Sequence, residues 1–404
     1  MDKQGFASLC ARDVVHGSPS HILPIHQTST FIYPSPEVAM KYFKGESEEE
    51  VYIYSRWGNP TVNAVEEKIA ALECFDLKDS AGNNLKAKAL MFSSGMGAIS
   101  AVLLSNLKAG DAVITSGNIY GTSMELMQTI LPDYGIEMIL CDLKNMNELE
   151  EKIKSNPKVK MIYIETPSNP NTDCYDLSAI SSVAKKHKLK TAVDNTIASP
   201  FLQQPFKYGI DFIVHSTTKF LNGHGTAISG LMVGIDSEFM KKRAWTIRKT
   251  IGASANPMDA WLLNNGIKTL PLRMVQHSNN AYEVAKFLES NSSVAKVFYI
   301  GLKSHPDHLL ANTQMNDSGG VLSFELKGGL DAGIKLMQRV KFCHLTSTLG
   351  TIDTLINHPA SMTHVQVLKE QREKSGITDG LIRMSIGIEN VEDIIADLDQ
   401  ALKG

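Results

Sequence analysis

The chain has 404 residues, 43% of them hydrophobic and 21% charged, and a net charge of −3; this ordinary globular balance gives no reason to expect nucleic acid or an anionic membrane as a partner. No apolar run is long enough for a signal peptide or a membrane span, so we expect a cytoplasmic protein. The five cysteines are scattered without a CxxC or metal-ligand spacing, which predicts buried free thiols and no bound metal.

The first 60 residues predict an irregular arm without a core of its own. Pro19, Pro24, Pro34 and Pro36 are expected to interrupt any helix in this segment. A segment this long without regular structure must pack on something else. We therefore expect residues 1–60 to make contacts outside the domain that follows.

Residues 61–257 alternate between helical and strand patterns, which predicts a mostly parallel sheet with helices on both faces. The polar composition of residues 76–88 predicts a loop inserted at the surface. In such a sheet, ligands gather at the carboxyl ends of the strands. The predicted helices are 62–72, 98–107, 121–131, 147–154 and 177–187; the predicted strands are 89–92, 112–115, 137–140, 160–164, 212–214 and the strand that Asp194 closes.

Residues 258–404 change in character and predict a smaller α+β domain. Long helical patterns open and close this part of the chain, and shorter strand patterns lie between them. The predicted helices are 258–268, 273–289, 331–339 and 391–402, and the predicted strands are 295–299, 321–326 and 343–346.

The stretch HSTTK after the strand at 212–214 carries the first chemical signal. The hydroxyls of Ser216 and Thr218 lie two positions apart, and Lys219 follows directly. Hydroxyls can donate to a phosphate, and an amine can form a Schiff base with an aldehyde. The stretch therefore suits pyridoxal phosphate, although Lys219 considered alone could equally be a solvated loop lysine.

Two further stretches support the same cofactor. Asp194 closes a hydrophobic strand 25 positions before Lys219, and a carboxylate there can keep the pyridine nitrogen protonated. The small residues around Gly95 and Met96, at a strand-to-helix turn, can offer backbone N–H groups to the phosphate. Together the three stretches predict an aldehyde trap, a ring-nitrogen partner and a phosphate cradle.

Nine motifs resemble the trans-sulfuration enzymes, which use pyridoxal phosphate on cysteine and methionine. The motifs are YSRWGNPT, SSGMGAIS, IYG, ETPSNP, VDNT, HSTTKF, GIKTLPLRM, HPASMTH and LIRMSIGIE. They run from Tyr54 to the C-terminal region and cover nearly the whole chain. The resemblance implies the aspartate aminotransferase-like fold, type I of the pyridoxal-phosphate-dependent transferases, as well as an arm that wraps a neighbouring subunit.

The resemblance also implies roles for residues outside the three stretches. Tyr120 would stack on the cofactor ring and act with Lys219 as a catalytic residue, and Arg383 would bind the α-carboxylate of the substrate. Tyr54 and Arg56 would reach into the adjacent subunit's site and bind the cofactor phosphate. The further cofactor contacts implied are Asn169, Thr196, Asp194, Gly95, Met96, Ser216 and Thr218, and the further substrate contacts are Ser347, Thr348 and Asn169.

An amino-acid substrate gives Arg383 a physical reason to be where it is. Arg383 lies inside the apolar run 381–386, and a buried charge is costly unless it is paired. A substrate carboxylate is one such partner, and an internal ion pair is the alternative.

The residues around the site identify the reaction less specifically than the motifs identify the family. Ile53 and Ser347 stand where cystathionine lyases usually carry acids, which favours a small apolar tail such as that of methionine. Thr122 replaces the cysteine that is typical of methionine lyases, and Thr226 is typical of sulfhydrylases. We expect a carbon–sulfur lyase that acts by γ-elimination, most of all a methionine γ-lyase.

Several alternatives stay open at this point. They are cystathionine γ-lyase, the γ-replacement enzymes cystathionine γ-synthase and O-acetylhomoserine sulfhydrylase, and a catalytically idle protein that only holds the cofactor. Arg56 in an arm without its own core predicts at least a homodimer with shared sites, and a dimer of dimers as the expected assembly.

Overall fold

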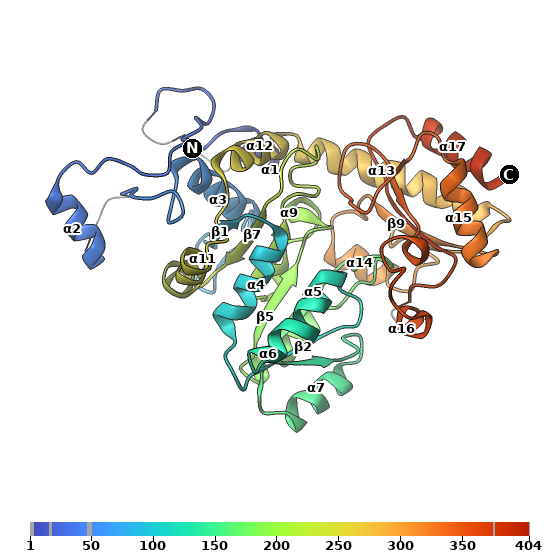
Figure 1. Cartoon of the computed structure of the whole chain (residues 1–404), viewed down its shortest axis with the longest axis horizontal. Coiled ribbons are helices and arrows are strands. Elements are labelled where there is room, and N and C mark those ends of the chain that lie inside the picture. The colour runs from blue at the N-terminus through green and yellow to red at the C-terminus, as the bar shows by residue number, and fades with distance from the viewer. Residues whose placement is uncertain (1–3, 16–17, 47–50, 375, 404) are drawn as a thin grey trace.

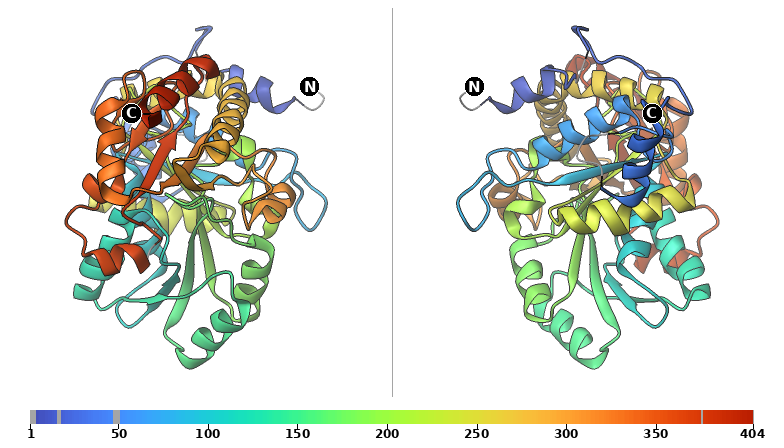
Figure 2. Two further views of the ribbon diagram at one scale, coloured as in Figure 1. Left: turned by 90° about the vertical axis from the view of Figure 1, so that its right-hand side faces the viewer. Right: turned by 90° about the vertical axis from the view of Figure 1, so that its left-hand side faces the viewer.

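The computed structural model describes residues 4–15, 18–46, 51–374 and 376–403. Figure 1 shows a central domain, a smaller domain at the C-terminal end and an arm at the N-terminal end, and Figure 2 shows the same arrangement from two sides. The predicted α/β class and type I fold are confirmed by this architecture. The domain limits at 60 and 257 stay predictions.

A seven-stranded sheet with the order β1-β7-β6-β5-β4-β2-β3 forms the centre of the large domain. β7 runs antiparallel to both of its neighbours, and the other strands run in one direction. The strands are β1 Lys88–Phe92, β2 Ala112–Thr115, β3 Glu137–Leu140, β4 Val159–Glu165, β5 Lys190–Asp194, β6 Phe212–Ser216 and β7 Gly230–Gly234.

Both faces of this sheet are buried by helices, as Figure 1 shows. Alternate residues of one strand enter different cores: Ile213 packs with α3 and α12, whereas Val214 packs with α4. The helices and helical turns are α3 Pro60–Glu73, α4 Gly95–Asn106, α5 Gly121–Glu125, η1 Leu126–Ile130, α6 Leu131–Asp133, α7 Met146–Ser155, α8 Leu177–Lys186, α9 Ser199–Leu202, η2 Pro205–Tyr208, α10 Ser237–Phe239, η3 Met240–Ala244, α11 Trp245–Ile251 and α12 Pro257–Lys268.

A five-stranded sheet with the order β10-β11-β12-β9-β8 forms the smaller domain. Its apolar face packs against α13, α15 and α17. The elements are α13 Leu270–Ser290, β8 Val294–Phe298, α14 His308–Gln314, β9 Val321–Leu326, α15 Gly329–Arg339, β10 His344–Leu345, β11 Leu355–Asn357, η4 Pro359–Ser361, α16 Lys369–Lys374, β12 Leu381–Ser385 and α17 Val391–Lys403.

The described part of the arm contains two helices, so the prediction of an irregular arm was wrong, although none of the four prolines considered above lies in the interior of a helix. α1 Phe6–Ala11 packs on α3 and α12 through the buried Cys10. α2 Pro36–Lys44 begins at a proline, where the missing N–H costs no helical hydrogen bond, and Ser35 caps it. α2 buries none of its residues and projects from the end of the molecule (Figure 1), where its Phe43 ring meets the Trp57 ring edge to face at 6.1 Å between centroids.

Three helical predictions need correction. α13 begins at Leu270, three residues before the predicted start at 273. The predicted helix 121–131 is interrupted by the π-helical turn η1. α4 begins three residues before the predicted start at 98, because Ser94 accepts a hydrogen bond from the N–H of Gly97.

Candidate active site

The carboxyl ends of three neighbouring parallel strands meet at one edge of the large sheet. β4, β5 and β6 lie side by side and end at Glu165, Asp194 and Ser216. Asn169 lies in the loop after β4, and Lys219 lies in the turn after β6. The residue types predicted to carry the chemistry are thus gathered at the edge where such sheets bind ligands.

Lys219 is half-buried in a turn that fixes its backbone. Its N–H donates to the carbonyl of Ser216 at 3.1 Å, and its carbonyl accepts from the N–H of Gly223 at 2.7 Å. The Nζ atom donates to Oγ1 of Thr348 at 2.7 Å. Burial, and then the positive charge of Arg383, lowers the pKa of Lys219 from 10.5 to about 8. About a tenth of the amine is therefore neutral at pH 7.

This lowered pKa predicts how pyridoxal phosphate is captured by the cofactor-free chain. Only the neutral amine attacks the aldehyde, so the capture rate should rise about tenfold per pH unit below pH 8 and level off above it. Stopped-flow absorbance measures the rate, and Nα-acetyl-lysine is the reference amine. A rate that keeps rising to about pH 10, as expected for the reference amine, would contradict the lowered pKa.

Asp194 supplies a buried carboxylate to the same edge. Its Oδ1 accepts from the N–H of Thr196 at 3.0 Å and from the Thr196 hydroxyl at 2.5 Å, and its Oδ2 accepts from the Tyr163 hydroxyl at 3.3 Å. Burial raises the pKa of Asp194. Since these hydrogen-bond donors are neutral, a protonated ring nitrogen fits as the counter-charge of this carboxylate.

The N terminus of α4 forms a cradle suited to a phosphate. The Oγ of Ser94 accepts from Gly97 at 3.1 Å, whereas the N–H groups of Gly95 and Met96 have no acceptor within the helix. A Cβ atom at Gly95 would lie 2.7 Å from the Cβ of Ser216. Only glycine therefore allows α4 and the end of β6 to approach this closely.

The threonines near this cradle already have hydrogen-bond partners. Oγ1 of Thr196 accepts from the N–H of Ser216 at 2.8 Å, which ties β5 to β6. Oγ1 of Thr218 donates to the carbonyl of Ser229 at 3.2 Å and accepts from its N–H at 3.1 Å. The Thr218 hydroxyl must therefore rotate away from this carbonyl before it can donate to a phosphate.

Tyr120 and Asn169 have side chains with unused bonding capacity. Tyr120 directly precedes α5 and is 48% exposed, as expected for a ring that faces an open site. Oδ1 of Asn169 is buried and has no hydrogen-bond partner among the described residues. A ring carrying a hydroxyl group fits between such an aromatic side chain and such an amide.

Arg383 lies in β12 and is buried together with its charge. Its Nη2 donates to the carbonyl oxygens of Ser347 at 3.2 Å and Thr348 at 2.7 Å. Burial lowers the pKa of Arg383 to about 10, and no carboxylate within the described part of the chain forms an ion pair with it. Its buried Nε lacks a partner among the described residues, so a carboxylate ligand fits better than the internal ion pair considered above.

Within the described residues of one chain, Tyr54 and Arg56 do not bond to the site residues at the carboxyl ends of the strands. The Arg56 guanidinium carbon lies 5.3 Å from the centre of the Tyr54 ring, and Nη1 of Arg56 donates to the carbonyl of Lys249 at 2.7 Å. Where the structure describes the chain, no hydrogen bond joins either residue to Lys219 or Asp194.

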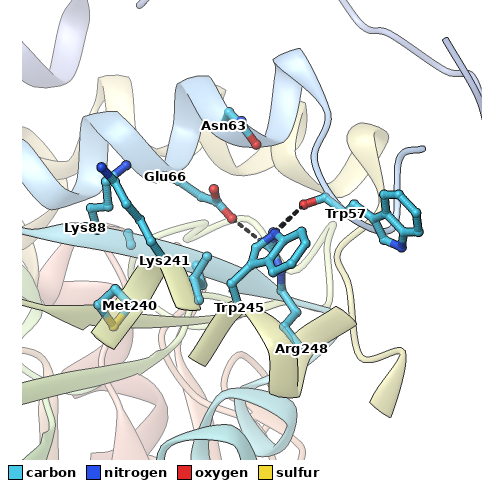
Figure 3. Close-up of a pocket in the computed structure, with 10 residues that line it drawn as sticks. Trp57, Asn63, Glu66, Lys88, Met240, Lys241, Trp245 and Arg248 are labelled. Carbon is cyan, nitrogen blue, oxygen red and sulfur yellow. Dashed lines mark hydrogen bonds and ion pairs between the residues drawn. The ribbon is translucent and has the colours of Figure 1, made fainter. Parts of the chain in front are cut away.

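A buried ion pair that the sequence did not indicate anchors this part of the arm. Arg248 and Trp245 on α11 donate to the carbonyl of Trp57 at 3.0 and 2.8 Å, and Arg248 also pairs with Glu66 at 2.5 Å. Figure 3 shows these groups meeting beside a surface pocket. The motif YSRWGNPT contains Trp57, but nothing in it indicates that α11 holds its backbone.

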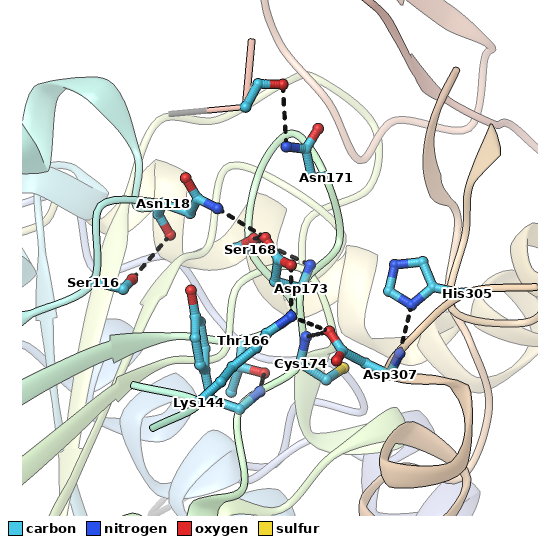
Figure 4. Close-up of polar contacts among 12 residues, drawn as sticks. Ser116, Asn118, Lys144, Thr166, Ser168, Asn171, Asp173, Cys174, His305 and Asp307 are labelled. Carbon is cyan, nitrogen blue, oxygen red and sulfur yellow. Dashed lines mark hydrogen bonds and ion pairs between the residues drawn. The ribbon is translucent and has the colours of Figure 1, made fainter. Parts of the chain in front are cut away.

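Glu165, inside the motif ETPSNP, also had no predicted role. Its carboxylate is buried and accepts from the backbone N–H groups of Tyr120 at 2.7 Å and Asn169 at 3.0 Å. A second polar cluster, centred on Lys144 and Asp173, reaches the loop after β4 through Ser168 (Figure 4). Both sets of contacts join segments that are far apart in the sequence, so no local pattern indicates them.

Comparison with known proteins agrees with the geometry. A family described as Cys/Met metabolism PLP-dependent enzyme matches residues 12–403. The chain is 46% identical to an L-methionine gamma-lyase of Fusobacterium nucleatum over 94% of this chain and 93% of the relative. It is 42% identical to a cystathionine beta-lyase of Lactococcus lactis, with the same coverage. A crystal structure of cystathionine gamma-lyase from Lactobacillus plantarum with L-serine has a TM-score of 0.89 at 33% identity and covers 99% of both chains.

The fold and the site define a pyridoxal-phosphate-dependent enzyme. The chain belongs to the family of Cys/Met metabolism PLP-dependent enzymes, so the predicted family and the predicted cofactor are confirmed. When bound, the cofactor withdraws electrons from the α-carbon of an amino acid. The residues that would hold it are Lys219, Asp194, Asn169, Tyr120, Ser216 and the N terminus of α4.

Proposed function

We propose that this protein is a carbon–sulfur lyase that cleaves L-methionine by γ-elimination. One water is consumed, and the products are methanethiol, α-ketobutyrate and ammonia. The observation that carries this proposal is the link between Lys219 and Arg383 through Thr348. The Thr348 hydroxyl lies 2.7 Å from Nζ of Lys219, and its carbonyl lies 2.7 Å from Nη2 of Arg383. An amino acid bound to Arg383 through its carboxylate would bring its α-carbon close to the Lys219 amine.

Each residue has a separate role in this reaction. Arg383 binds the substrate carboxylate, and charge-assisted hydrogen bonds of this kind contribute about 1.5–3 kcal/mol each. Lys219 removes the proton from the α-carbon, which its lowered pKa allows near neutral pH. Tyr120 carries an exposed hydroxyl that protonates the leaving sulfur. Asp194 keeps the ring nitrogen protonated.

The residues at two positions that differ from cystathionine lyases favour methionine over a substrate with a second amino group. Ile53, at one position where cystathionine lyases usually carry an acid, is apolar and buried. Ser347, at the other such position, is uncharged, and Thr348 beside it uses its hydroxyl to hold Lys219. The methionine lyases among the similar relatives support this choice.

Cystathionine cleavage or γ-replacement is the second candidate. Thr226, typical of sulfhydrylases, donates to Oδ1 of Asn222 at 3.3 Å and leaves no acid after the GHG turn. The similarity to cystathionine lyases also favours this candidate.

Product analysis on a panel of substrates tests the proposal. Keto acid and thiol are measured with methionine, homocysteine, cystathionine, cysteine and O-acetylhomoserine, with and without added thiol. We expect methionine to give equal amounts of α-ketobutyrate and methanethiol. Turnover of cystathionine alone, or of O-acetylhomoserine only with added thiol, would favour the second candidate. A protein that binds the cofactor and releases no keto acid from any substrate would be an idle homologue.

We also propose that the protein assembles with other copies of itself through the arm and that it is located in the cytoplasm. The isolated chain leaves Ile32 97% exposed and Phe43 62% exposed, and a neighbouring subunit would bury this surface. This supports a homodimer with shared sites, and two such dimers would form a tetramer. All five cysteines are buried free thiols, which supports a reducing, cytoplasmic location. No helix in the described residues has the length and apolar composition of a membrane span.

A further inference from the structure

Glu165 joins the two segments that carry Tyr120 and Asn169. It is the last residue of β4 and is 5% exposed. Each of its two carboxylate oxygens holds one segment, since Oε2 accepts from the N–H of Tyr120 at 2.7 Å and Oε1 accepts from the N–H of Asn169 at 3.0 Å. The carboxylate therefore sets the distance between the backbone of the aromatic residue and the backbone of the amide residue.

The strand pairing places Glu165 beside the ring-nitrogen partner. Glu165 of β4 and Asp194 of β5 are paired in register, at the carboxyl ends of adjacent parallel strands. Burial, and then the charge of Asp194, raises the pKa of Glu165 to about 8. Two ionised carboxyl groups placed this close are costly, so Glu165 takes up a proton near neutral pH and still presents two oxygens to the two backbone N–H groups. This cost indicates that the position needs an acceptor with two oxygens.

A second carboxylate ties the same two segments together further from the cofactor residues. Oδ2 of Asp173 accepts from Nδ2 of Asn118 at 2.9 Å and from the hydroxyl of Ser168 at 3.3 Å (Figure 4). Asn118 precedes Tyr120 by two positions, and Ser168 directly precedes Asn169.

Asp173 is itself connected to the smaller domain. Lys144 donates to Oδ1 of Asp173 at 2.8 Å and to Oδ2 of Asp307 at 2.6 Å (Figure 4). The segment of Tyr120 and the segment of Asn169 are thus clamped at two levels, by Glu165 through backbone groups and by Asp173 through side chains.

We propose that Glu165 is a positioning residue that holds the ring of Tyr120 and the amide of Asn169 at the separation needed to clasp pyridoxal phosphate. The inference rests on the proposed function only through the cofactor contacts of these two residues. Glu165 itself touches neither cofactor nor substrate in this scheme. Its contribution is made before binding, because it fixes the two segments in advance.

The variant Glu165→Gln tests the inference with little change in size. Glutamine keeps one acceptor oxygen, but its NH2 group would face the second backbone N–H, so one of the two segments is released. Asp397→Asn is the matched control. Asp397 on α17 is 6% exposed and accepts from the backbone N–H groups of Lys341, Phe342 and Cys343, in the smaller domain.

Three quantities are measured on the full-length chain. They are the Kd of pyridoxal phosphate from titration of the cofactor-free protein, the visible circular dichroism of the bound cofactor, and the melting temperature without cofactor. For Glu165→Gln we expect the Kd to rise about tenfold, equivalent to about 1.4 kcal/mol, together with a changed circular dichroism. For Asp397→Asn we expect a lower melting temperature with both cofactor measurements unchanged.

An unchanged Kd and circular dichroism for Glu165→Gln would overturn the inference, as would equal changes in the control. If Glu165→Gln does not fold, Asp173→Asn replaces it, with an expected rise in Kd of about threefold because only the contacts of Asp173 are weakened. If the proposed function is wrong, the wild-type protein itself gives a different result. A wild-type protein that binds the cofactor but does not cleave methionine would leave the binding comparison fully measurable.

Discussion

Replacement of Lys219 by alanine is expected to abolish keto-acid release while the chain still folds. The variant loses the nucleophile that holds the cofactor and the base that takes the α-proton. General acid–base catalysis alone contributes about 10²–10⁴-fold, so we expect turnover to fall by at least about 10³-fold. Keto-acid release from methionine measures the loss, and far-ultraviolet circular dichroism checks the fold.

The fold should tolerate this change because the half-buried Lys219 side chain makes one hydrogen bond within the described part of the chain, to Thr348, and its charge is costly there. Lys207→Ala, an exposed lysine on η2, is the control and should keep wild-type turnover. Release of keto acid by Lys219→Ala at a rate near that of the wild type would remove Lys219 from the mechanism.

Mixing two inactive variants is expected to restore about a quarter of the wild-type activity. Arg56→Ala lacks the group proposed to reach the neighbouring site, and Lys219→Ala lacks the catalytic amine. Random reassembly makes about half of the dimers mixed, and each mixed dimer holds one site with both defects and one site with neither. The expected recovery follows from the contacts of Arg56, which bonds Lys249 and not the Lys219 cluster of its own chain.

The test requires the subunits to exchange, so the variants are mixed in mild denaturant and refolded together. Each variant refolded alone provides the baseline. If every subunit completed its own site, each site in a mixed dimer would retain one defect, and mixing would recover nothing. That outcome would reject shared sites while leaving the assignment of Lys219 intact.

The strands that carry the chemistry could be predicted because their apolar runs end in unusual polar residues. The pattern before Asp194 and Ser216 marks β5 and β6, and the pattern of β9 at 321–326 matches its observed bounds. β7 was not predicted because Gly230 and Gly234 enclose only three apolar residues, and two glycines this close together are typical of a turn. A Cβ at Gly230 would collide with the carbonyl oxygen of Ser94, so packing demands the glycine that hides the strand.

The parts of the site that could not be predicted depend on contacts across long sequence separations. Glu165 bonds Tyr120 across 45 positions, and Arg248 pairs with Glu66 across 182. In both cases a common acidic residue accepts hydrogen bonds that only the folded chain brings near. The π-helical turn η1 was missed for a related reason, since its hydrogen-bond spacing has no residue signature comparable to a cap or a proline.

Thr348 has a consequence for anyone who wishes to redesign the substrate range. Its side chain holds the amine of Lys219, whereas its main chain holds the guanidinium of Arg383. A library at this single codon therefore alters the environment of the amine and leaves the carboxylate anchor in place, provided that the loop keeps its path. By contrast, changes in the loop around Thr348 alter the carboxylate anchor and not the side chain that holds the amine. Substitutions of Thr348 can thus tune the reactivity of the amine, whereas changes in the surrounding loop can tune how the substrate carboxylate is held.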